Sequence, residues 1–386
     1  MQFQYHIPTK IHFGPGTLAT LGKETLPGKR ALIVVSAGPS MKINGYLERV
    51  VALLRSNHVD AVVFDKILPN PIKRHVMEGA ALARAEHCDF VIGLGGGSSI
   101  DSAKSIAIMA KNPGDYWDYI NGGTGKGQPV TGGSLPVVAI TTTAGTGTEA
   151  DPWTVITHED RQEKIGFGLS PLTFPVLSIV DPELMLTVPP RLTAFQGFDA
   201  FFHAAEGILA NIATPISDAY AVKAIELIAK SLPLAVADGG NLEARTDVAL
   251  ANTLAGMVES TSCCTSEHSL AHALGACHPD IPHGAALIMV SIPYFRFFAE
   301  KAQDRVAMIA KAMDYSGAGR DVVAALQQLQ DACGVSNLRL SDFGVQRDQI
   351  PKYVQNAFDT MGFLFTLDRY QLSFDETVRI LEDSYR

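Results

Sequence analysis

Two pairs of side chains with a four-residue spacing stand in the second half of the chain and could together hold a metal ion. Asp199 and His203 form the first pair, His268 and His272 form the second, and His283 follows shortly afterwards. Because a helix turns once in about 3.6 residues, each pair lies on one face of a helix, and two such faces can converge on one ion. Carboxylate and imidazole ligands together suit Fe²⁺ or Zn²⁺.

The simplest ligand set is one carboxylate and three imidazoles, namely Asp199, His203, His268 and His283. Four protein ligands still leave room for a substrate oxygen if the ion expands its coordination. His272 could instead be the fourth ligand, or it could carry a proton near neutral pH. His278 is a third claimant for that position. The spacing therefore predicts a metal site and leaves its fourth ligand open.

A glycine-rich turn far upstream predicts a phosphate site. Gly95, Gly96 and Gly97 follow an apolar run, and Ser98 and Asp101 open the helical pattern that comes next. Glycine permits positive φ and close approach of the backbone, and the positive end of a helix favours an anion. We expect these residues to contact the diphosphate of a dinucleotide. A tight turn between strand and helix, with no ligand, is the alternative explanation.

A second polar loop supports the prediction of a nucleotide. Thr142, Thr143 and Thr146 follow an apolar strand and offer hydroxyls and bare backbone to a ribose or a nicotinamide amide. Two such loops at the ends of neighbouring strands indicate a cofactor, although threonine-rich runs also form ordinary strand edges. Leu177, at the start of a later apolar run, is included among the expected cofactor contacts. A metal and a dinucleotide in one chain indicate redox chemistry.

The elements that must position these residues fall into two groups. Short β-branched runs alternate with helical patterns in the first half, at 31–36, 59–64, 90–94, 137–141 and 177–181. Strands that alternate with helices predict right-handed crossovers and a mostly parallel sheet covered on both faces. We therefore expect a Rossmann-like α/β domain over residues 1–187.

The second half of the chain has helical periodicity throughout. The expected helices cover 194–209, 218–231, 244–260, 269–275, 294–314, 322–333, 349–359 and 374–385. Two prolines at 189 and 190 interrupt the pattern before the first of them. An all-α domain that carries the metal site is expected over residues 188–386.

Composition excludes several classes of function. The 386-residue chain has a formal net charge of -9, and no clustered Lys and Arg stripe is visible, which argues against nucleic acid or anionic membrane as partner. No apolar stretch approaches the roughly 20 residues of a membrane span, and the first residues lack the order of a signal peptide. Five cysteines without Cys-x-x-Cys spacing predict reduced thiols. We expect a cytoplasmic protein.

In the order of its motifs, the chain resembles the iron-containing, or group III, alcohol dehydrogenase family. The motifs are Pro69-Asn70-Pro71, the glycine turn with its helix up to Lys104, the threonine loop up to Glu149, the segments Phe198–Glu206 and His268–Gly275, and Pro282-His283-Gly284.

The resemblance implies a dinucleotide-binding α/β domain, a helical domain, and a metal and nicotinamide in the cleft between them. It implies that Asp199, His203, His268 and His283 are the ligands and that His272 assists proton movement. Asn70 joins the cofactor contacts. The family also implies a homodimer or a higher homo-oligomer, with a small alcohol or aldehyde as substrate.

The sequence departs from the family pattern around the substrate. Phe198 replaces the usual Met before the metal aspartate, and the segment 273–282 is one residue longer than is common. The usual Asn-Pro-Arg near the C-terminus is replaced by the segment 360–366. Four side chains are candidates to shape an apolar substrate pocket, namely Phe198, Phe202, Cys263 and Trp153.

The residue after the second strand bears on the choice of nicotinamide. Members that prefer NAD place an acidic residue there, which accepts hydrogen bonds from the ribose 2′-OH and repels a 2′-phosphate. This chain has Ser36, followed by small residues and Lys42. NADP(H) is therefore favoured over NAD(H), and Ser36 is expected to contact the cofactor.

The predicted activity is reversible hydride transfer between a primary alcohol or aldehyde and the nicotinamide, with Fe²⁺ as the first choice of metal and Zn²⁺ as the second. The alternative is a dehydroquinate synthase-like or glycerol dehydrogenase-like enzyme that uses NAD and a metal on a polyol or a sugar-derived substrate. A phosphate-eliminating lyase needs cations around its substrate, and the metal segments are flanked instead by Phe, Ala, Leu and Cys.

Overall fold

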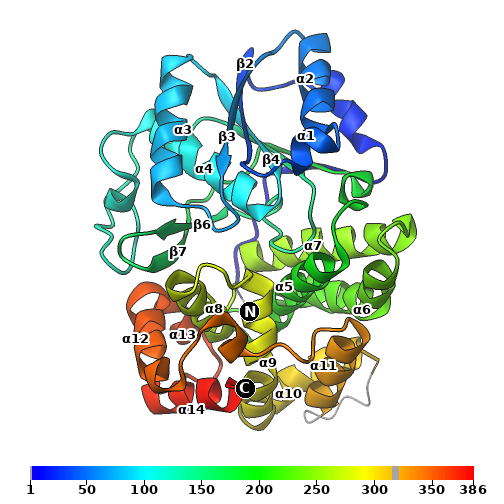
Figure 1. Ribbon diagram of the computed structural model, residues 1–386, viewed down its shortest axis with the longest axis vertical. Helices are drawn as coiled ribbons and strands as arrows, with labels where there is room; N and C mark the ends of the chain where they lie inside the picture. The colour runs from blue at the N-terminus through cyan, green and yellow to red at the C-terminus, as the bar shows by residue number, and fades with distance from the viewer. Residues whose placement is uncertain (1, 315–320) are drawn as a thin grey trace.

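The computed structural model describes residues 2–314 and 321–386. Figure 1 shows an α/β part above and a helical part below. The strands are β1 (Lys10–Phe13), β2 (Arg30–Ser36), β3 (Asp60–Ile67), β4 (Phe90–Gly95), β5 (Val137–Thr141), β6 (Trp153–His158), β7 (Glu163–Gly168) and β8 (Leu177–Val180).

The helices of the α/β part are α1 (Ser40–Ile43), α2 (Tyr46–Ser56), α3 (Lys73–Ala85) and α4 (Gly97–Lys111). Those of the helical part are α5 (Pro190–Leu209), α6 (Pro215–Ala237), α7 (Leu242–Thr261), α8 (Ser266–Cys277), α9 (His283–Lys301), α10 (Gln303–Ala312), α11 (Asp321–Ala332), α12 (Ile350–Met361), α13 (Phe363–Leu367) and α14 (Phe374–Ser384).

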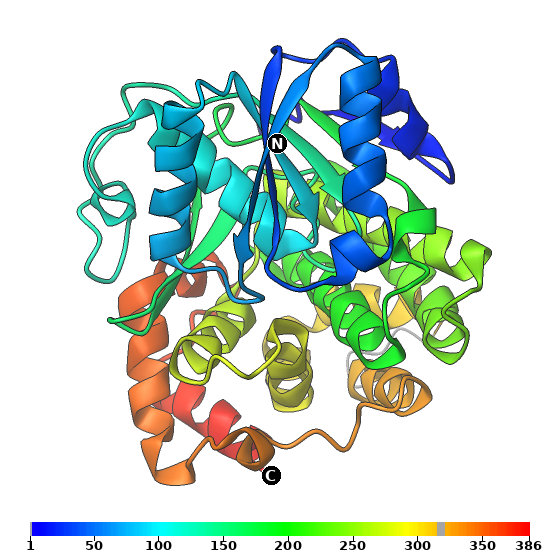
Figure 2. The same cartoon turned by 45° about the horizontal axis from the view of Figure 1, so that its top comes forward.

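Six strands form one parallel sheet in the order β1-β8-β5-β4-β2-β3. β2 shows why both faces are covered: Leu32 and Val34 pack against α3 and α4, while Ile33 and Val35 face the short helix η1 (Thr17–Gly22) and α2. Side chains alternate along a strand, so an uninterrupted apolar run needs a helical layer on each side. Figure 2 shows the strands between α2 and α3.

The prediction of an α/β part with a mostly parallel sheet, followed by a helical part, is confirmed. Three strands escaped the sequence analysis. The edge strand β1 has only four residues, two of them basic or histidine. β6 and β7 form a separate antiparallel hairpin that packs against α8 and α12. Which of their side chains are buried is therefore decided by helices far away in the sequence rather than by a local pattern.

The helix expected over 294–314 is wrong. Ala302 leaves helical geometry and separates α9 from α10. Phe298 before the break and Val306 after it both pack in the helical core. The apolar periodicity therefore continues across the break, which made two helices look like one.

The prolines at the start of the helical part begin a helix rather than merely interrupting a pattern. Pro189 is the N-cap of α5, and Pro190 occupies its first turn, where a missing N–H costs nothing. None of the described helices is long and apolar enough to cross a membrane.

Candidate active site

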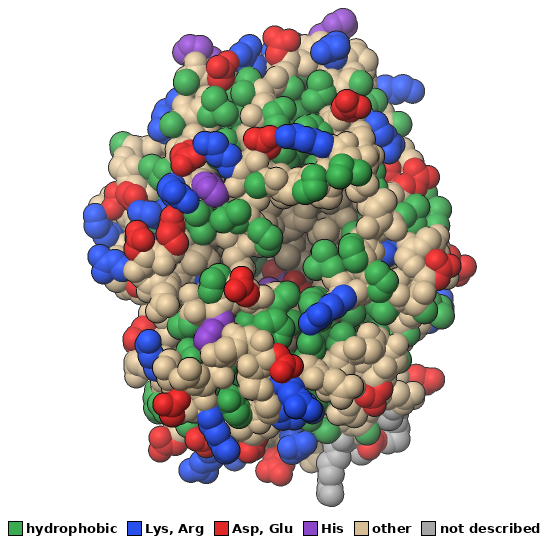
Figure 3. Space-filling view, viewed as in Figure 1, with side chains coloured by type: hydrophobic (Ala, Val, Ile, Leu, Met, Phe, Trp, Pro, Cys, Tyr) green, Lys and Arg blue, Asp and Glu red, His purple; other side chains and the backbone are tan. Residues whose placement is uncertain are grey.

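A cavity of about 830 Å³ lies between the two parts of the molecule. Its lining runs from Ser36 in the α/β part to His283 in the helical part. In Figure 3 the surface is hollowed at the centre of this face. The volume is in the range of pockets that hold a cofactor and a small substrate.

The metal ligands expected from the sequence converge at the helical side of this cavity. Asp199 Oδ1 lies 3.7 Å from His203 Nε2, 3.6 Å from His268 Nε2 and 3.5 Å from His283 Nε2. Ligands bound at about 2.0–2.2 Å around a tetrahedral ion stand roughly 3.3–3.6 Å apart. The three imidazole nitrogens therefore each lie at a suitable distance from Asp199 Oδ1, and Asp199, His268 and His283 form one compact group that could hold an ion.

Three helices bring these four side chains together. α5 carries Asp199 and His203 one turn apart, α8 carries His268, and α9 begins with His283. Asp199 Oδ1 and His268 Nε2 are buried and have no hydrogen-bond partner in the described chain. A buried polar atom without a partner is costly, so a cation at this point would satisfy both.

The other ring nitrogens of two histidines are bound by the protein. His268 Nδ1 makes a short contact with Glu206 Oε1, and His203 Nδ1 lies 3.2 Å from the carbonyl oxygen of Gly145. Such partners fix the orientation of an imidazole and direct its remaining nitrogen to a metal. Glu206 was not assigned a role from the sequence, although it lies one turn after His203.

The pKa values of the histidines diverge across the cluster. Burial lowers the pKa of His203, but the carboxylates of Glu259 and Asp199 outweigh it and raise the net value. For His268 the burial effect is likewise outweighed, chiefly by Glu206, so its pKa is well above the ordinary one. Burial, with the charge of Lys164, takes the pKa of His283 well below the ordinary value.

His272 lies in the cavity beside this cluster. Its ring centroid is 5.2 Å from that of His283 and 6.3 Å from that of His268. Burial, with the charge of Lys164, lowers its pKa well below the ordinary value, and its Nδ1 has no described partner. His272 therefore lines the site with a ring nitrogen that the described chain does not engage. His278 lies outside the lining, where its Nε2 is 2.9 Å from the hydroxyl of Tyr353.

The glycine turn and the threonine loop contact each other at the ends of β4 and β5. Gly95 has a φ of +144°, and a Cβ on Gly97 would come within 2.4 Å of Thr146. Only glycine allows this close approach. α4 starts at Gly97 and points its N-terminus into the cavity, which is the geometry that binds a diphosphate.

All but one of the expected cofactor residues line the cavity, namely Ser36, Asn70, Gly95, Gly96, Gly97, Ser98, Asp101, Thr142, Thr143 and Thr146. Leu177 does not. It starts β8 and pairs with Val138, while the cavity lies at the other end of the sheet near Thr141. Because parallel strands present their carboxyl ends to a ligand, the first residue of β8 is too far away to contact it.

Several of these side chains are engaged by the protein itself. The Ser98 hydroxyl donates to the carbonyl of Pro69. Asp101 accepts hydrogen bonds from Thr148 Oγ1 at 2.7 Å and from Val155 N at 2.9 Å, and burial raises its pKa to about 6. Their side chains thus hold the loops in place, and the backbone is left to contact a ligand.

Asn70 links the two parts of the molecule. Its Nδ2 donates to the carbonyl of Pro279 at 2.6 Å, and its Oδ1 accepts from Lys164 Nζ at 3.2 Å. Burial lowers the pKa of Lys164 to about 8, although Asp199 and Asp101 oppose the shift. Lys164 comes from the hairpin that sequence analysis missed, and its local sequence carries no functional signal.

The substrate-pocket candidates divide evenly. Cys263 and Trp153 line the cavity. Phe198 and Phe202 are fully buried in the helical core instead and do not line the cavity. Glu259 and Cys264 also line the cavity and were not anticipated.

Comparison with known proteins identifies a family. Residues 8–182 match the model of the iron-containing alcohol dehydrogenases, and residues 193–385 match the C-terminal model of the same family. The chain is 35% identical to 1,3-propanediol dehydrogenase of Citrobacter freundii over 92% of each protein. It is 35% identical to NADPH-dependent butanol dehydrogenase of Clostridium saccharobutylicum, with 81% of this chain and 79% of that one aligned.

Solved structures of alcohol dehydrogenases also superpose on this chain. An alcohol dehydrogenase of a halo-thermophilic archaeon from a Red Sea brine pool superposes with a TM-score of 0.95 at 36% identity, and covers 100% of this chain and 99% of its own. The two family models together span nearly the whole sequence, so this oxidoreductase belongs to the iron-containing alcohol dehydrogenase family.

Proposed function

We propose that the protein is a metal-dependent, NADP(H)-preferring enzyme that interconverts small primary alcohols and aldehydes. The observation that carries the proposal is the convergence of three imidazole nitrogens on Asp199 Oδ1, at one end of a cavity large enough for a nucleotide. The two relatives named above act, by their names, on 1,3-propanediol and on butanol.

Asp199, His203, His268 and His283 would hold the metal, with Fe²⁺ as the first choice and Zn²⁺ as the second. Their oxygen and nitrogen donors fit either ion, and the partnerless Asp199 Oδ1 and His268 Nε2 indicate where it would bind. A bound divalent ion supplies Lewis acidity toward an alcohol or carbonyl oxygen.

His272 is the proposed proton carrier. It is 5% exposed and faces the cavity next to His283 without belonging to the group around Asp199. Its lowered pKa keeps it neutral, so it can accept a proton released when an alcohol is oxidised. Aldehyde reduction would use the same path in reverse.

The preference for NADP(H) rests on the end of the cavity that Ser36 lines. The carboxylates in the described lining are Asp101, Asp151, Asp199, Glu259 and Asp280. None of them belongs to the neighbouring stretches 36–41 and 67–71. An acidic side chain would repel a 2′-phosphate, so its absence from these stretches favours NADP(H). Lys42 does not line the cavity, and it pairs with Asp65 at 2.7 Å.

The test is reduction of butyraldehyde and of a small aldehyde panel, with NADPH and NADH compared on protein loaded separately with Fe²⁺ and with Zn²⁺. We expect turnover with both nucleotides and a higher kcat/KM with NADPH. The His268→Ala variant should be inactive under every condition. Preference for NADH would overturn the cofactor proposal, and absence of turnover across the panel would overturn the activity.

A further inference from the structure

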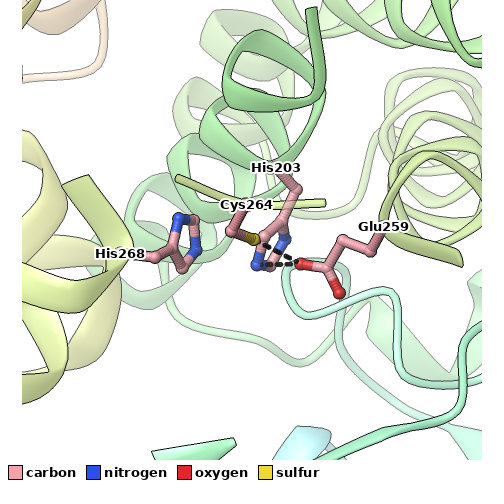
Figure 4. A group of neighbouring side chains, drawn as sticks. All are labelled: His203, Glu259, Cys264 and His268. Carbon is pink, nitrogen blue, oxygen red and sulfur yellow. Dashed lines mark hydrogen bonds and ion pairs between the residues drawn. The ribbon is translucent and has the colours of Figure 1, made fainter. Parts of the chain in front are cut away.

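A second group of metal-binding side chains overlaps the first. It consists of His203, Glu259, Cys264 and His268, whose ligand atoms all lie within 4.8 Å of one another. Figure 4 shows these four side chains gathered in one place. Glu259 comes from the end of α7, and Cys264 comes from the turn between α7 and α8. Neither belongs to the family motifs identified in the sequence.

Glu259 contacts both His203 and the thiol of Cys264. Its Oε1 lies 2.6 Å from His203 Nε2 and 3.1 Å from Cys264 Sγ, which donates to it. His203 Nε2 therefore lies near two carboxylates, because Asp199 Oδ1 is 3.7 Å away. The rings of His203 and His268 are stacked with centroids 4.4 Å apart. These contacts place an oxygen and a sulfur donor beside two imidazoles.

Burial makes this arrangement a built site rather than a surface coincidence. Glu259 is 7% exposed and His268 is 3% exposed, and both line the cavity with Cys264. A carboxylate held in such surroundings needs a cationic or hydrogen-bonding partner. Glu259 has such partners in His203 and Cys264, and a divalent ion between the four groups would replace these contacts by coordination.

We propose that Glu259 and Cys264 form, with His203 and His268, a second coordination position for the metal, next to the position proposed above at Asp199, His203, His268 and His283. This inference rests on the proposed metal-dependent function. His268 has one free ring nitrogen, since Nδ1 is held by Glu206. The two positions therefore exclude each other, and a single ion occupies one or the other.

The two positions differ in chemical softness. A thiolate ligand favours Zn²⁺ and similar ions, whereas carboxylate and imidazole ligands alone accept Fe²⁺ equally well. On binding, the S–H bond of Cys264 breaks, its proton passes to water, and the sulfur donates its electron pair to the ion. Zn²⁺ should thus move toward Cys264 and away from His283, while Fe²⁺ stays with Asp199 and His283.

Cobalt substitution tests this directly, because a thiolate bound to Co²⁺ gives a charge-transfer absorption that oxygen and nitrogen ligands do not give. We expect the band in the wild-type protein and its loss in Cys264→Ser, with one Co²⁺ per chain retained by the first position. The matched control is Cys263→Ser, since Cys263 lines the same cavity but is outside the ligand group. That variant should keep the band.

Metal content provides an independent measurement. His283→Ala removes a ligand of the first position only, so it should retain Zn²⁺ and lose Fe²⁺. The double variant His283→Ala/Cys264→Ser should lose both ions. Circular dichroism shows whether each variant is folded. Cys264→Ala provides a second variant that lacks the thiol.

The outcomes separate this inference from the proposed function. Bound Co²⁺ without a charge-transfer band, or a band that survives Cys264→Ser, would overturn the second position and leave the metal-dependent activity intact. Failure of the wild-type protein to bind Co²⁺, Zn²⁺ or Fe²⁺ would overturn both.

Discussion

At the scale of single residues, the site depends on side chains that orient other side chains. Glu206 is fully buried, and besides His268 it accepts hydrogen bonds from the backbone N–H of Thr265 at 2.7 Å and from its hydroxyl at 2.9 Å. These bonds hold the carboxylate still, which in turn fixes the imidazole of His268.

Glu206→Gln should therefore weaken metal binding without removing a ligand. Loss of such an orienting partner typically costs 10- to 100-fold in metal affinity, and about the same is expected here. Competition with a coloured chelator measures the affinity. Glu226→Gln, at an exposed position of α6, is the control and should bind as the wild type does. Equal affinities for the two variants would show that Glu206 does not orient His268.

Ser36 carries the prediction on cofactor choice. Ser36→Asp places a carboxylate where the 2′-phosphate of NADP is expected, and like charges in contact cost several kcal/mol. We expect kcat/KM with NADPH to fall by about 10- to 100-fold, and activity with NADH to be kept or improved. Ser36→Ala should keep the original preference. If Ser36→Asp leaves the ratio of kcat/KM with NADPH to that with NADH unchanged, the adenosine end of the cofactor binds away from Ser36.

Lys164 gives a pH dependence of stability. Its pKa is about 8 in the folded protein against the ordinary 10.5. Between these pH values the unfolded chain binds more protons than the folded one, so the free energy of unfolding rises with pH. Below about pH 8 the full cost of burying the charged lysine is present. Lys164→Met should thus be more stable than the wild type near neutral pH.

The advantage of Lys164→Met should shrink by about 2 kcal/mol between about pH 7 and about pH 9.5. Urea unfolding of metal-free protein at the two pH values measures it. Lys29→Met is the control, because Lys29 is exposed. A constant difference across the range would mean that Lys164 stays charged when the protein is folded.

At the scale of elements, α7 supports the threonine loop by direct contact between glycines. A Cβ on Gly256 would lie 2.1 Å from the carbonyl oxygen of Gly147. Gly147 has a φ of +64°, and its N–H donates to Asn252 on the same helix at 2.9 Å. The helical part therefore shapes a loop of the nucleotide-binding part.

Gly256→Ala should destabilise the protein by about 1–3 kcal/mol, because the helix and the loop must separate to admit the methyl group. The loss should be accompanied by weaker binding of the nicotinamide. Gly275→Ala in α8 is the matched control for stability, since its Cβ would meet Lys164 Nζ at an ordinary 3.5 Å. That helical substitution should be neutral or stabilising. Equal melting temperatures for Gly256→Ala and Gly275→Ala would show that the contact between Gly256 and Gly147 can relax.

At the scale of the whole molecule, a metal at the proposed ligands would join three helices, α5, α8 and α9, that are otherwise connected through the helical core. An ion that binds only the folded chain stabilises it by mass action, by about 2.7 kcal/mol at a hundredfold excess over Kd. Metal binding should therefore be visible in the thermal stability of the protein.

Metal removal by a chelator should lower the melting temperature by roughly 5 to 10 °C, if the helical part unfolds as one unit. Differential scanning calorimetry with and without added metal measures the change. In His268→Ala the two scans should coincide, because both coordination positions use this residue. A metal-induced shift that persists in this variant would mean that the ion binds elsewhere.

Local patterns in the sequence determined much of this molecule. The apolar runs of β2, β4 and β5 predict buried parallel strands because a strand covered on both faces has no polar side. The spacing of Asp199 and His203 predicts one shared helix face because the helical repeat is a local property. The glycines at 95–97 predict a tight loop because the freedom of glycine to adopt positive φ is also a local property.

Only the tertiary structure decided which side chains share the cavity. Glu259 lies 56 residues after His203 in the chain, yet the packing of α7 against α5 places it 2.6 Å from that imidazole. Lys164 enters the cavity from a hairpin whose two short strands have no apolar run of their own. Leu177 and Phe198 fail as predicted contacts because strand direction and helix rotation turn them away from the cavity. Spacing along the chain determines which side chains share an element, whereas long-range packing determines which elements meet.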